Sequence, residues 1–428
     1  QLDKAVAAAR AAFPGWAALP IEERRKYILA LSQAILDNSD QLTQLLTLEQ
    51  GKPHADAKQE IAGAALLLQA HTTLELPVLK AEDTPEHTVE THYVPIGVVG
   101  AISPWNFPIV LAIFKIGPGL LAGNTMVLKP SPFTPLTTLK IGEIARGILP
   151  DGVLNIISGG DSLGPWMTSH PGFDKISFTG SSQTGRRVME SASKTLKRVT
   201  LELGGNDAAI ILPDVDVEKV AEQLFWSAFI NNGQVCIATK RLYIHKDIYD
   251  PLAAALVEYG KTVKVGDGAQ QGSQIGPINN LPQYERVLDL IADAKAKGYK
   301  FLMGGDVSDV PGYFVPVTMI DNPPEDSRIV REEQFGPVLP LIKFDDIDDV
   351  IAKANDSEYG LAGSVWSADE DKAVEIARRL ATGTVFVNQI QTVNYVEPDN
   401  PPNAGYEGRK LGRGTFALQC HDPGSRVS

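Results

Sequence analysis

Cys236 is one of two cysteines in the 428-residue chain, and its sequence context suggests chemistry. A thiol is the best nucleophile among the side chains near neutral pH, because a few per cent of it is already thiolate. Asn-Asn-Gly-Gln at 231–234 interrupts an apolar helical run just before Cys236, and Gly233 lets the backbone turn tightly there. A lone cysteine is more often a small buried hydrophobic residue. The interpretation of Cys236 as a nucleophile therefore needs support from the rest of the chain.

Glu202 is a second residue whose context suggests chemistry, here acid–base chemistry. It lies at the end of an apolar, strand-like run and is followed by Gly204 and Gly205. A carboxylate at such a place can be partly desolvated, which favours a role as general base. The alternative is structural, with the carboxylate accepting hydrogen bonds from the N–H groups of the two glycines.

The elements that would position these residues alternate between strand and helix. Apolar runs of strand length occur at 96–102, 125–128, 153–157, 175–178 and 199–203. Helical patterns lie between most of them, at 109–122, 135–148 and 185–193. This alternation predicts an α/β fold with a doubly wound parallel sheet, in which ligands bind beyond the carboxyl ends of the strands. Residues 1–76 are predicted to be helical, and the alternating segment 88–94 is typical of a strand in a projecting hairpin.

The loops that follow these predicted strands carry polar residues and glycines. The loop at 178–185 keeps Gly180 and Gly185, the outer glycines of a Gly-x-Gly-x-x-Gly fingerprint, and places Ser181 between them. Alone this is a weak signal, but after a strand and before a helix it favours a pyrophosphate or ribose site. Lys129 follows the second strand, where a dinucleotide-binding sheet meets the adenosine ribose. These loops therefore indicate a nucleotide site.

Five motifs together resemble the aldehyde dehydrogenase superfamily. They are Pro-Trp-Asn-Phe-Pro at 104–108, Phe-Thr-Gly-Ser at 178–181, Leu-Glu-Leu-Gly-Gly at 201–205, Asn-Gly-Gln-Val-Cys at 232–236 and Glu-Glu-Gln-Phe-Gly-Pro at 332–337. Each motif alone would be weak, but the five occur in the family's order, and the separation of Glu202 from Cys236 also fits. The resemblance covers residues 2–388 and supports Cys236 as a nucleophile.

The resemblance implies oxidation of an aldehyde to a carboxylic acid with NAD(P)+. Cys236 would add to the aldehyde carbonyl to give a thiohemiacetal, and hydride transfer would leave a thioester. Glu202 matches the general base that activates the water for thioester hydrolysis. The matching donors to the oxyanion are the Asn106 side-chain amide and the Cys236 backbone N–H. Lys115 matches a lysine that helps to relay protons.

The resemblance also implies a dinucleotide cofactor. The residues assigned to it are Ser103, Trp105, Lys129, Ser131, Pro132, Gly180, Ser181, Leu203, Glu333 and Phe335. Members that strongly prefer NAD commonly carry a glutamate three residues after the lysine that matches Lys129, and Pro132 stands there instead. Pro132 has no donor and no charge that would repel a 2′-phosphate. We therefore expect that NAD is used and that NADP is also accepted.

The expected partner is a small-molecule aldehyde, and the predicted substrate wall is apolar. Its residues are Ile109, Val110, Ile113, Phe114, Phe229, Val235 and Ile237. This lining favours medium aliphatic or aromatic aldehydes over charged ones. Two alternatives stay open: a CoA-acylating aldehyde dehydrogenase, against which Glu202 counts, and a non-catalytic binding or structural protein built on the same fold.

Composition excludes several other classes of partner. The net charge of −13 and the pI near 5.1 argue against nucleic acid or an anionic membrane surface. The chain has no apolar run of about 18 residues, so no transmembrane span is expected. Two cysteines cannot form a disulfide framework and fit a reducing compartment, which predicts a cytoplasmic protein. The histidines show no metal-ligand spacing, so no metal site is expected.

The predicted domains follow from the resemblance. A dinucleotide-binding domain comprises 1–76 and 96–203, a second α/β, catalytic domain comprises 204–390, and a small oligomerisation element comprises the hairpin at 77–95 and the tail at 391–428. The tail departs from the family pattern, because 402–414 keeps only fragments of the expected loop and the remainder does not suggest a helix and a strand. The hairpin predicts a homo-oligomer, a dimer more readily than a tetramer, with assembly weakened by the tail.

Overall fold

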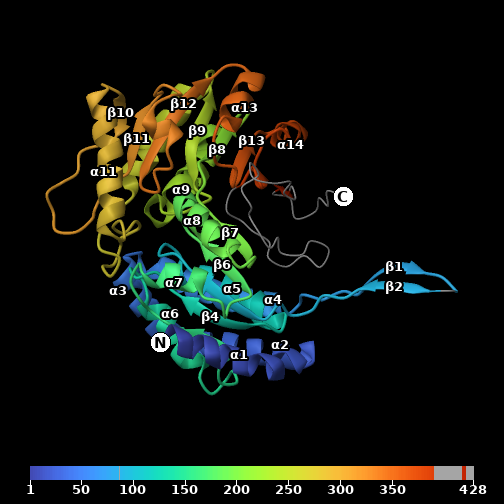
Figure 1. Ribbon diagram of the computed structural model, residues 1–428. Coiled ribbons are helices and arrows are strands. Elements are labelled where there is room, and N and C mark those ends of the chain that lie inside the picture. The colour runs from blue at the N-terminus through green and yellow to red at the C-terminus, as the bar shows by residue number, and fades with distance from the viewer. Residues whose placement is uncertain (86, 390–416, 421–428) are drawn as a thin grey trace. The chain divides into compact units, whose positions relative to one another are not determined.

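A computed structural model describes residues 1–85, 87–389 and 417–420 (Figure 1). These residues form two compact units. Unit 1 comprises 1–49 and 55–201, and unit 2 comprises 50–54, 202–389 and 417–420.

Unit 1 contains a five-stranded sheet with helices packed on it. Its helices are α1 (Leu2–Ala18), α2 (Ile21–Asp37), α3 (Ser39–Gln50), α4 (His54–His71), α5 (Pro108–Leu121), α6 (Leu136–Ala145), α7 (Leu163–Ser169) and α8 (Ser182–Ser193). Its sheet strands are β3 (Val98–Ile102), β4 (Thr125–Lys129), β5 (Leu154–Ile156), β6 (Lys175–Thr179) and β7 (Arg198–Glu202), in the order β5-β4-β3-β6-β7. The pairs β3–β4, β3–β6 and β4–β5 are parallel. The predicted doubly wound α/β fold is confirmed.

The core of unit 1 explains why these segments fold as they do. Val99 and Ala101 of β3 point to one face of the sheet and join a buried cluster with Ile109 and Ile113 of α5. Pro108 is favoured at the first position of α5, because its missing N–H would have no partner inside the helix. The start of α5 is thus fixed at the last residue of the Pro-Trp-Asn-Phe-Pro motif.

The hairpin of unit 1 consists of β1 (Leu79–Asp83) and β2 (Thr88–Thr91), which pair antiparallel. Every described residue from 75 to 94 is exposed, and the hairpin projects from the unit (Figure 1). An isolated two-stranded hairpin is only marginally stable in water. The hairpin predicted from the alternation at 88–94 is therefore present, and its described residues are exposed.

Unit 2 is built on an eight-stranded sheet of order β10-β11-β12-β9-β8-β13-β14-β15. Its strands are β8 (Asp207–Ile211), β9 (Thr239–His245), β10 (Lys300–Met303), β11 (Thr318–Asp321), β12 (Val338–Phe344), β13 (Ala362–Trp366), β14 (Thr384–Val387) and β15 (Ala417–Cys420). Its helices are α9 (Val217–Phe229), the 3-10 turn η1 (Ile230–Gly233), α10 (Tyr249–Thr262), α11 (Leu281–Ala296), α12 (Arg328–Arg331), α13 (Ile347–Asn355) and α14 (Glu370–Ala377). Only the β10–β11 pair is antiparallel among the described pairs of this sheet.

The two faces of this sheet bury different clusters. Ala208 and Ile210 of β8 belong to a cluster that also includes residues of α11, α13 and α14. Ala209 and Ile211, which point the opposite way, belong to a cluster with residues of α9 and α10. Continuous burial of β8 on both faces is typical of a parallel strand covered by helices. The second α/β domain expected from the sequence is confirmed as a fold.

The tail differs in one respect from the expectation that it contains no strand. Residues 417–420 form β15, which pairs in parallel with β14, with Thr384 opposite Ala417. A four-residue strand has too little length for a period-of-two pattern, and pairing with the edge of an existing sheet determines it instead. The other segments on which the tail prediction rested, 391–416 and 421–428, lie outside the described residues.

Candidate active site

Cys236 lies in a loop between α9 and β9 whose backbone is unusual. Asn231, Asn232 and Gly233 all have positive φ, at 51°, 61° and 70°. Asparagine tolerates this region better than other residues that carry a Cβ. A Cβ on Gly233 would overlap the carbonyl of Gly336, so this position requires glycine. Residues 231–235 are buried, whereas Cys236 and Ile237 are only partly buried.

The side chain of Lys240 binds the backbone of this loop. Its Nζ donates hydrogen bonds to the carbonyl oxygens of Val235 at 2.8 Å, Cys236 at 2.6 Å and Ala238 at 3.3 Å. An ammonium group has three donors, so one side chain satisfies three carbonyls of the same turn. The geometry of the Cys236 loop is thus tied to a single buried cation.

Glu333 lies beside the same cation. Its Oε1 is 3.9 Å from Lys240 Nζ and accepts a hydrogen bond of 3.0 Å from the Gly205 N–H. A Cβ on Gly204 would overlap the Glu333 carboxylate. Gly204, which follows Glu202 in the sequence motif, therefore allows the Glu333 carboxylate to pack closely against the backbone. Burial raises the pKa of Glu333, and Lys240 opposes that shift.

The electrostatic environment of Cys236 includes both signs of charge. Burial raises the pKa of the thiol to about 12, Lys240 acts to lower it, and Asp207, Glu202 and Glu333 raise it further. The thiol of this structure is thus protonated at neutral pH, and a base must accept its proton before it can attack. Glu202, the last residue of β7, is close enough to act on the thiol. The structure therefore brings the predicted residues Cys236, Glu202 and Glu333 into one cluster.

In unit 1, the residues around Asn106 are held by the start of α5. Asn106 is buried, two residues before Pro108. Glu60 of α4 accepts hydrogen bonds from the N–H groups of Ile109 at 3.0 Å and Val110 at 3.2 Å. A carboxylate at a helix N-terminus satisfies orphan donors and complements the helix dipole. Glu60 thus fixes the turn that carries Asn106.

Lys115, also on α5, is buried and contacts the central strands. Its Nζ donates to Thr179 Oγ1 at 2.7 Å and to Ser177 Oγ at 3.2 Å, and both acceptors lie on β6. These hydroxyls can in turn donate to further acceptors, so the arrangement is suited to a proton path. The predicted relay role of Lys115 stays a prediction.

The predicted cofactor residues of unit 1 lie at the carboxyl ends of its parallel strands. Ser103 follows β3, Lys129 ends β4, and Gly180 with Ser181 follows β6. Ser103 Oγ is buried and has no hydrogen-bond partner among the described residues. Ser181 caps α8, where its side chain accepts from the Thr184 N–H at 3.3 Å. The edge of the sheet at which nucleotides bind therefore carries polar groups, one of them without a partner.

Lys129, Ser131 and Pro132 form the loop after β4. Lys129 is buried, its Nζ donates to the Pro130 carbonyl at 3.3 Å, and burial lowers its pKa while Asp161 opposes the shift. Ser131 Oγ accepts from the Phe133 N–H at 3.2 Å. Pro132 is exposed, so a side chain at this position faces solvent. The described loop thus places a cation and an uncharged exposed position beside each other.

The remaining predicted cofactor residues are Trp105, Leu203 and Phe335, and all three are half-buried. The Trp105 carbonyl accepts from Thr134 Oγ1 at 3.5 Å. Phe335 has φ of 50°, an uncommon value for an aromatic residue, and its carbonyl accepts from Gln283 Nε2 at 3.0 Å. Strained backbone of this kind persists where surrounding contacts hold it, and it occurs often at functional sites.

The predicted substrate residues divide into two groups. Ile109, Ile113 and Phe229 are fully buried members of the hydrophobic cores of their own units. A side chain without exposed surface contacts no substrate unless the structure moves. Val110, Phe114 and Ile237 are half-buried, and Val235 is 7% exposed. The second group is therefore better suited to contact an aldehyde.

Sequence reasoning missed two residues of the Cys236 cluster, Lys240 and Asp207. Both are 3% exposed, and both lie at the ends of otherwise apolar strands, Lys240 near the start of β9 and Asp207 at the start of β8. The available signal was a charged residue at the end of a strand whose other residues are apolar. Lysine and aspartate side chains are almost never fully buried unless they are paired, so this position indicates a partner of opposite charge. Their meeting in space could not be inferred from their separation in sequence.

Two further features of the described part of the chain concern metal ligation and membrane crossing. No group of three or more His, Cys, Asp or Glu side chains there is arranged to hold a metal ion. None of the helices in that part combines the length and the apolar character that a bilayer crossing requires.

Comparison with known proteins places this geometry in a family. The model of the aldehyde dehydrogenase family matches residues 1–417. The chain is 41% identical over 387 residues to a putative aldehyde dehydrogenase, FUS7, of Gibberella fujikuroi, with 90% of this chain and 82% of that protein covered. It is 38% identical over 417 residues to the NADP+-dependent succinate-semialdehyde dehydrogenase GabD of Escherichia coli, with 95% and 86% covered.

A solved structure agrees with these sequence matches. The NAD-dependent aldehyde dehydrogenase of Sinorhizobium meliloti superimposes with a TM-score of 0.89 at 33% identity, with 92% of this chain and 80% of that chain covered. The motifs, the nucleophile loop and the two sheets thus lead to one conclusion: the chain belongs to the aldehyde dehydrogenase family.

Proposed function

We propose that this protein oxidises an aldehyde to a carboxylic acid with NAD(P)+, and that Cys236 is its nucleophile. The observation that carries the proposal is the Cys236 loop, in which a partly buried cysteine has its carbonyl bound by the Lys240 cation and its thiol under the electrostatic influence of three carboxylates. An isolated structural cysteine needs no such surroundings. We further assign cofactor binding to unit 1 and the nucleophile to unit 2.

In the proposed reaction, the Cys236 Sγ attacks the carbonyl carbon of the aldehyde after losing its proton. The bond formed is S–C, and the carbonyl oxygen becomes the oxyanion of a thiohemiacetal. The Cys236 backbone N–H and the Asn106 amide are the proposed donors to that oxyanion, and removal of one such donor typically costs about 3 kcal/mol in the transition state. For Asn106 the role rests on its motif, and the hydrogen bonds from the α5 N-terminus to Glu60 support a fixed position of that loop.

Collapse of the thiohemiacetal expels a hydride and leaves an acyl thioester on Cys236. Glu202 then takes a proton from water, the resulting hydroxide adds to the thioester carbonyl, and Cys236 leaves as thiolate with release of the carboxylic acid. The electrostatic influence of Glu202 on the thiol supports this assignment.

The residues present fit a nicotinamide dinucleotide. The unpartnered, buried Ser103 Oγ and the buried Lys129 ammonium lie at the carboxyl ends of adjacent parallel strands. When bound, the cofactor supplies the hydride acceptor. Lys129 is suited to the adenosine ribose hydroxyls, Ser181 to the phosphates at the start of α8, and Glu333 to the nicotinamide ribose. The relatives use either form of the cofactor, since GabD is NADP+-dependent and the S. meliloti enzyme is NAD-dependent.

For the substrate, we propose a medium aliphatic or aromatic aldehyde. The half-buried candidates, Val110, Phe114 and Ile237, are all apolar and offer no countercharge to an anionic substrate. GabD, whose name specifies a semialdehyde with a carboxylate, provides the contrasting substrate for the assay. A clear preference for succinate semialdehyde over hexanal and benzaldehyde in kcat/KM would reject this part of the proposal.

The hairpin supports a homo-oligomer. The hairpin and its flanks expose a set of large apolar side chains: Val78, Leu79, Val89, Tyr93 and Val94. Apolar side chains on a marginally stable hairpin are best explained by a partner that covers them. We propose that a second copy of this chain does so.

The deciding experiment compares the parent protein with Cys236→Ser and Glu202→Gln. We expect NAD(P)H formation at 340 nm with the parent, no formation with Cys236→Ser, and a single burst followed by a stalled thioester with Glu202→Gln. Mass spectrometry of the stalled variant should show the acyl group on Cys236. Normal turnover by Cys236→Ser would reject the proposal, and addition of CoA without stimulation would reject the acylating alternative.

A further inference from the structure

Two buried groups of opposite charge, Lys240 and Asp207, lie near Cys236, and the proposed reaction does not use them. Lys240 donates to three carbonyls of the Cys236 loop, as described above, and is 3% exposed. Asp207, at the start of β8, is also 3% exposed. Coulombic attraction links the two groups, because Lys240 favours the ionised form of the Asp207 carboxyl.

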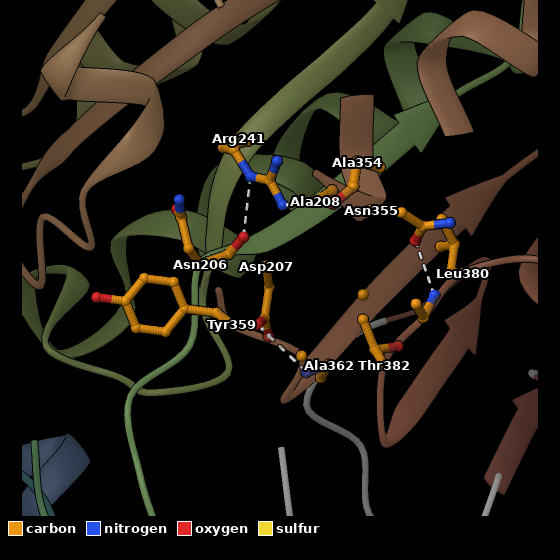
Figure 2. A pocket seen from close by; sticks show the side chains of 13 residues that line it. Asn206, Asp207, Ala208, Arg241, Ala354, Asn355, Tyr359, Ala362, Leu380 and Thr382 are labelled. Carbon is orange, nitrogen blue, oxygen red and sulfur yellow. Dashed lines mark hydrogen bonds between the residues drawn. The ribbon is translucent and has the colours of Figure 1, made fainter. Parts of the chain in front are cut away.

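Asp207 contacts the nucleophile loop through Gly205. The point at which a Gly205 Cβ would stand is 2.6 Å from the Cys236 carbonyl oxygen and 2.8 Å from Asp207 Oδ1. The carboxylate and the backbone of the nucleophile are thus separated only by a glycine without a side chain. Asp207 Oδ1 accepts a hydrogen bond of 3.2 Å from the Ala362 N–H (Figure 2). Asp207 Oδ2 is buried and has no hydrogen-bond partner among the described residues.

A purely structural role does not explain this arrangement. The hydrogen bond from Ala362 needs only an oxygen, which an asparagine would supply without the cost of burying a charge. Arg241, the other nearby cation, donates hydrogen bonds to backbone carbonyls, those of Asn206 at 2.9 Å and Ala354 at 2.9 Å, and not to the Asp207 carboxylate (Figure 2). An unpartnered carboxylate oxygen beside a nucleophile is therefore a feature of the site that needs another explanation.

We propose that Asp207 and Lys240 are positioning residues for the nucleophile: Lys240 fixes the carbonyls of Val235, Cys236 and Ala238, and the charge of Asp207 regulates how readily Cys236 loses its proton. The inference rests on the proposed function of Cys236. Neither side chain is assigned contact with the aldehyde. Four charged or titratable groups face Asp207: Lys240 and Arg241 on β9, Glu333 before β12 and Tyr359 before β13. Glu202 faces the thiol.

The charge of Asp207 changes in the pH range where the protein would work. Burial raises the pKa of Asp207 to about 7, and Lys240 opposes the shift. Ionised Asp207 disfavours the thiolate of Cys236, whereas protonated Asp207 does not. As pH rises from 6 to 8, the thiolate fraction should therefore increase less than tenfold per pH unit. The pair thus makes the reactivity of the thiol less sensitive to pH than that of a simple cysteine.

Alkylation of Cys236 by iodoacetamide tests this directly, because it reports the thiolate and requires no aldehyde. Rates are measured from pH 5.5 to 9 by mass spectrometry of the Cys236 peptide. For the parent, the plot of log rate against pH should have a slope below one between pH 6 and 8. Asp207→Asn should give a slope of one throughout, with parent-like rates at pH 6 and rates about tenfold higher above pH 8.

Two further variants complete the experiment. Asp348→Asn removes one carboxylate of unit 2 that is largely exposed and paired with Arg379, and its profile should match the parent. Lys240→Met should lower the alkylation rate at least tenfold at every pH, because the cation that favours the thiolate is lost. A profile of Asp207→Asn that coincides with the parent overturns the inference. If the pH profile of alkylation differs between Asp207→Asn and the parent, but the parent oxidises no aldehyde, the proposed function is rejected and the inference about the thiol is retained.

Discussion

Gly205→Ala is the substitution whose effect follows most directly from the geometry of the site. The added Cβ would lie 2.6 Å from the Cys236 carbonyl oxygen, 2.8 Å from Asp207 Oδ1 and 3.1 Å from Leu361 Cβ. A carbon and an oxygen that are not bonded need about 3.3 Å, so the Cys236 carbonyl must move by about 0.7 Å. That carbonyl is bonded to Lys240 at 2.6 Å and cannot move alone. The displacement is therefore passed to the nucleophile.

The expected magnitude is large for the reaction and moderate for stability. Misplacement of a reacting group by about 1 Å can lower the rate about 100-fold, so we expect kcat to fall by about that factor. Overpacking typically costs about 1–3 kcal/mol of folding free energy, which should appear as a lower midpoint of thermal unfolding.

The assay is steady-state NADH formation at 340 nm, with thermal unfolding measured on the same preparations. Gly63→Ala is the matched control, since a Cβ on Gly63, within α4, meets no atom within 4 Å. That variant should keep the parent kcat and gain about 0.5–1 kcal/mol of stability. A Gly205→Ala enzyme with kcat within about threefold of the parent would refute the argument from close packing.

Three other predictions concern the cofactor, assembly and pH. Pro132→Glu should lower kcat/KM for NADP at least tenfold more than for NAD, because the exposed carboxylate would repel a 2′-phosphate; an unchanged ratio would show that this loop does not control the choice. Val89→Arg with Val94→Arg should shift the protein toward monomer in multi-angle light scattering, since both side chains are exposed on or beside the hairpin, and an unchanged mass would exclude the hairpin as the interface. Burial lowers the pKa of His71 from 6.5 to about 4, so the unfolded chain binds a proton at this histidine more readily than the folded protein does. The free energy of unfolding is therefore unaffected by this group above pH 6.5 and decreases as pH falls toward 4, by up to about 3 kcal/mol. His71→Gln should remove that part of the acid sensitivity in thermal unfolding, and an identical pH profile in the variant would contradict it.

Much of the fold could be predicted because its signals are local. Apolar runs such as 96–102 and helical patterns such as 109–122 correspond to β3 and α5, whose burial follows directly from their composition. Pro108 and Gly51 mark a helix start and a helix end through backbone restrictions that act within a few residues. The four-residue β15 carried no such signal, since only its pairing with β14 defines it.

The candidate site could be predicted in part for the same reason. Cys236, Glu202 and Glu333 stand in motifs whose order along the chain identifies them. The predicted wall residues Ile109, Ile113 and Phe229 show the limit of this reasoning, because an apolar residue beside a motif has the same sequence signature in a substrate wall and in a core. Burial in the cores of their units distinguishes the two, and burial is a property of the packed structure.

By itself, then, the sequence determined which segments become strands and helices, which residue is the candidate nucleophile and which family the motifs indicate. Tertiary structure alone decided the environment of that nucleophile. Lys240 and Asp207 lie on different strands and meet at Cys236 because β8 and β9 are neighbours in one sheet. Whether a thiol holds or loses its proton depends on burial and on charges within a few ångströms, and those distances are set by strand pairing and not by position along the chain.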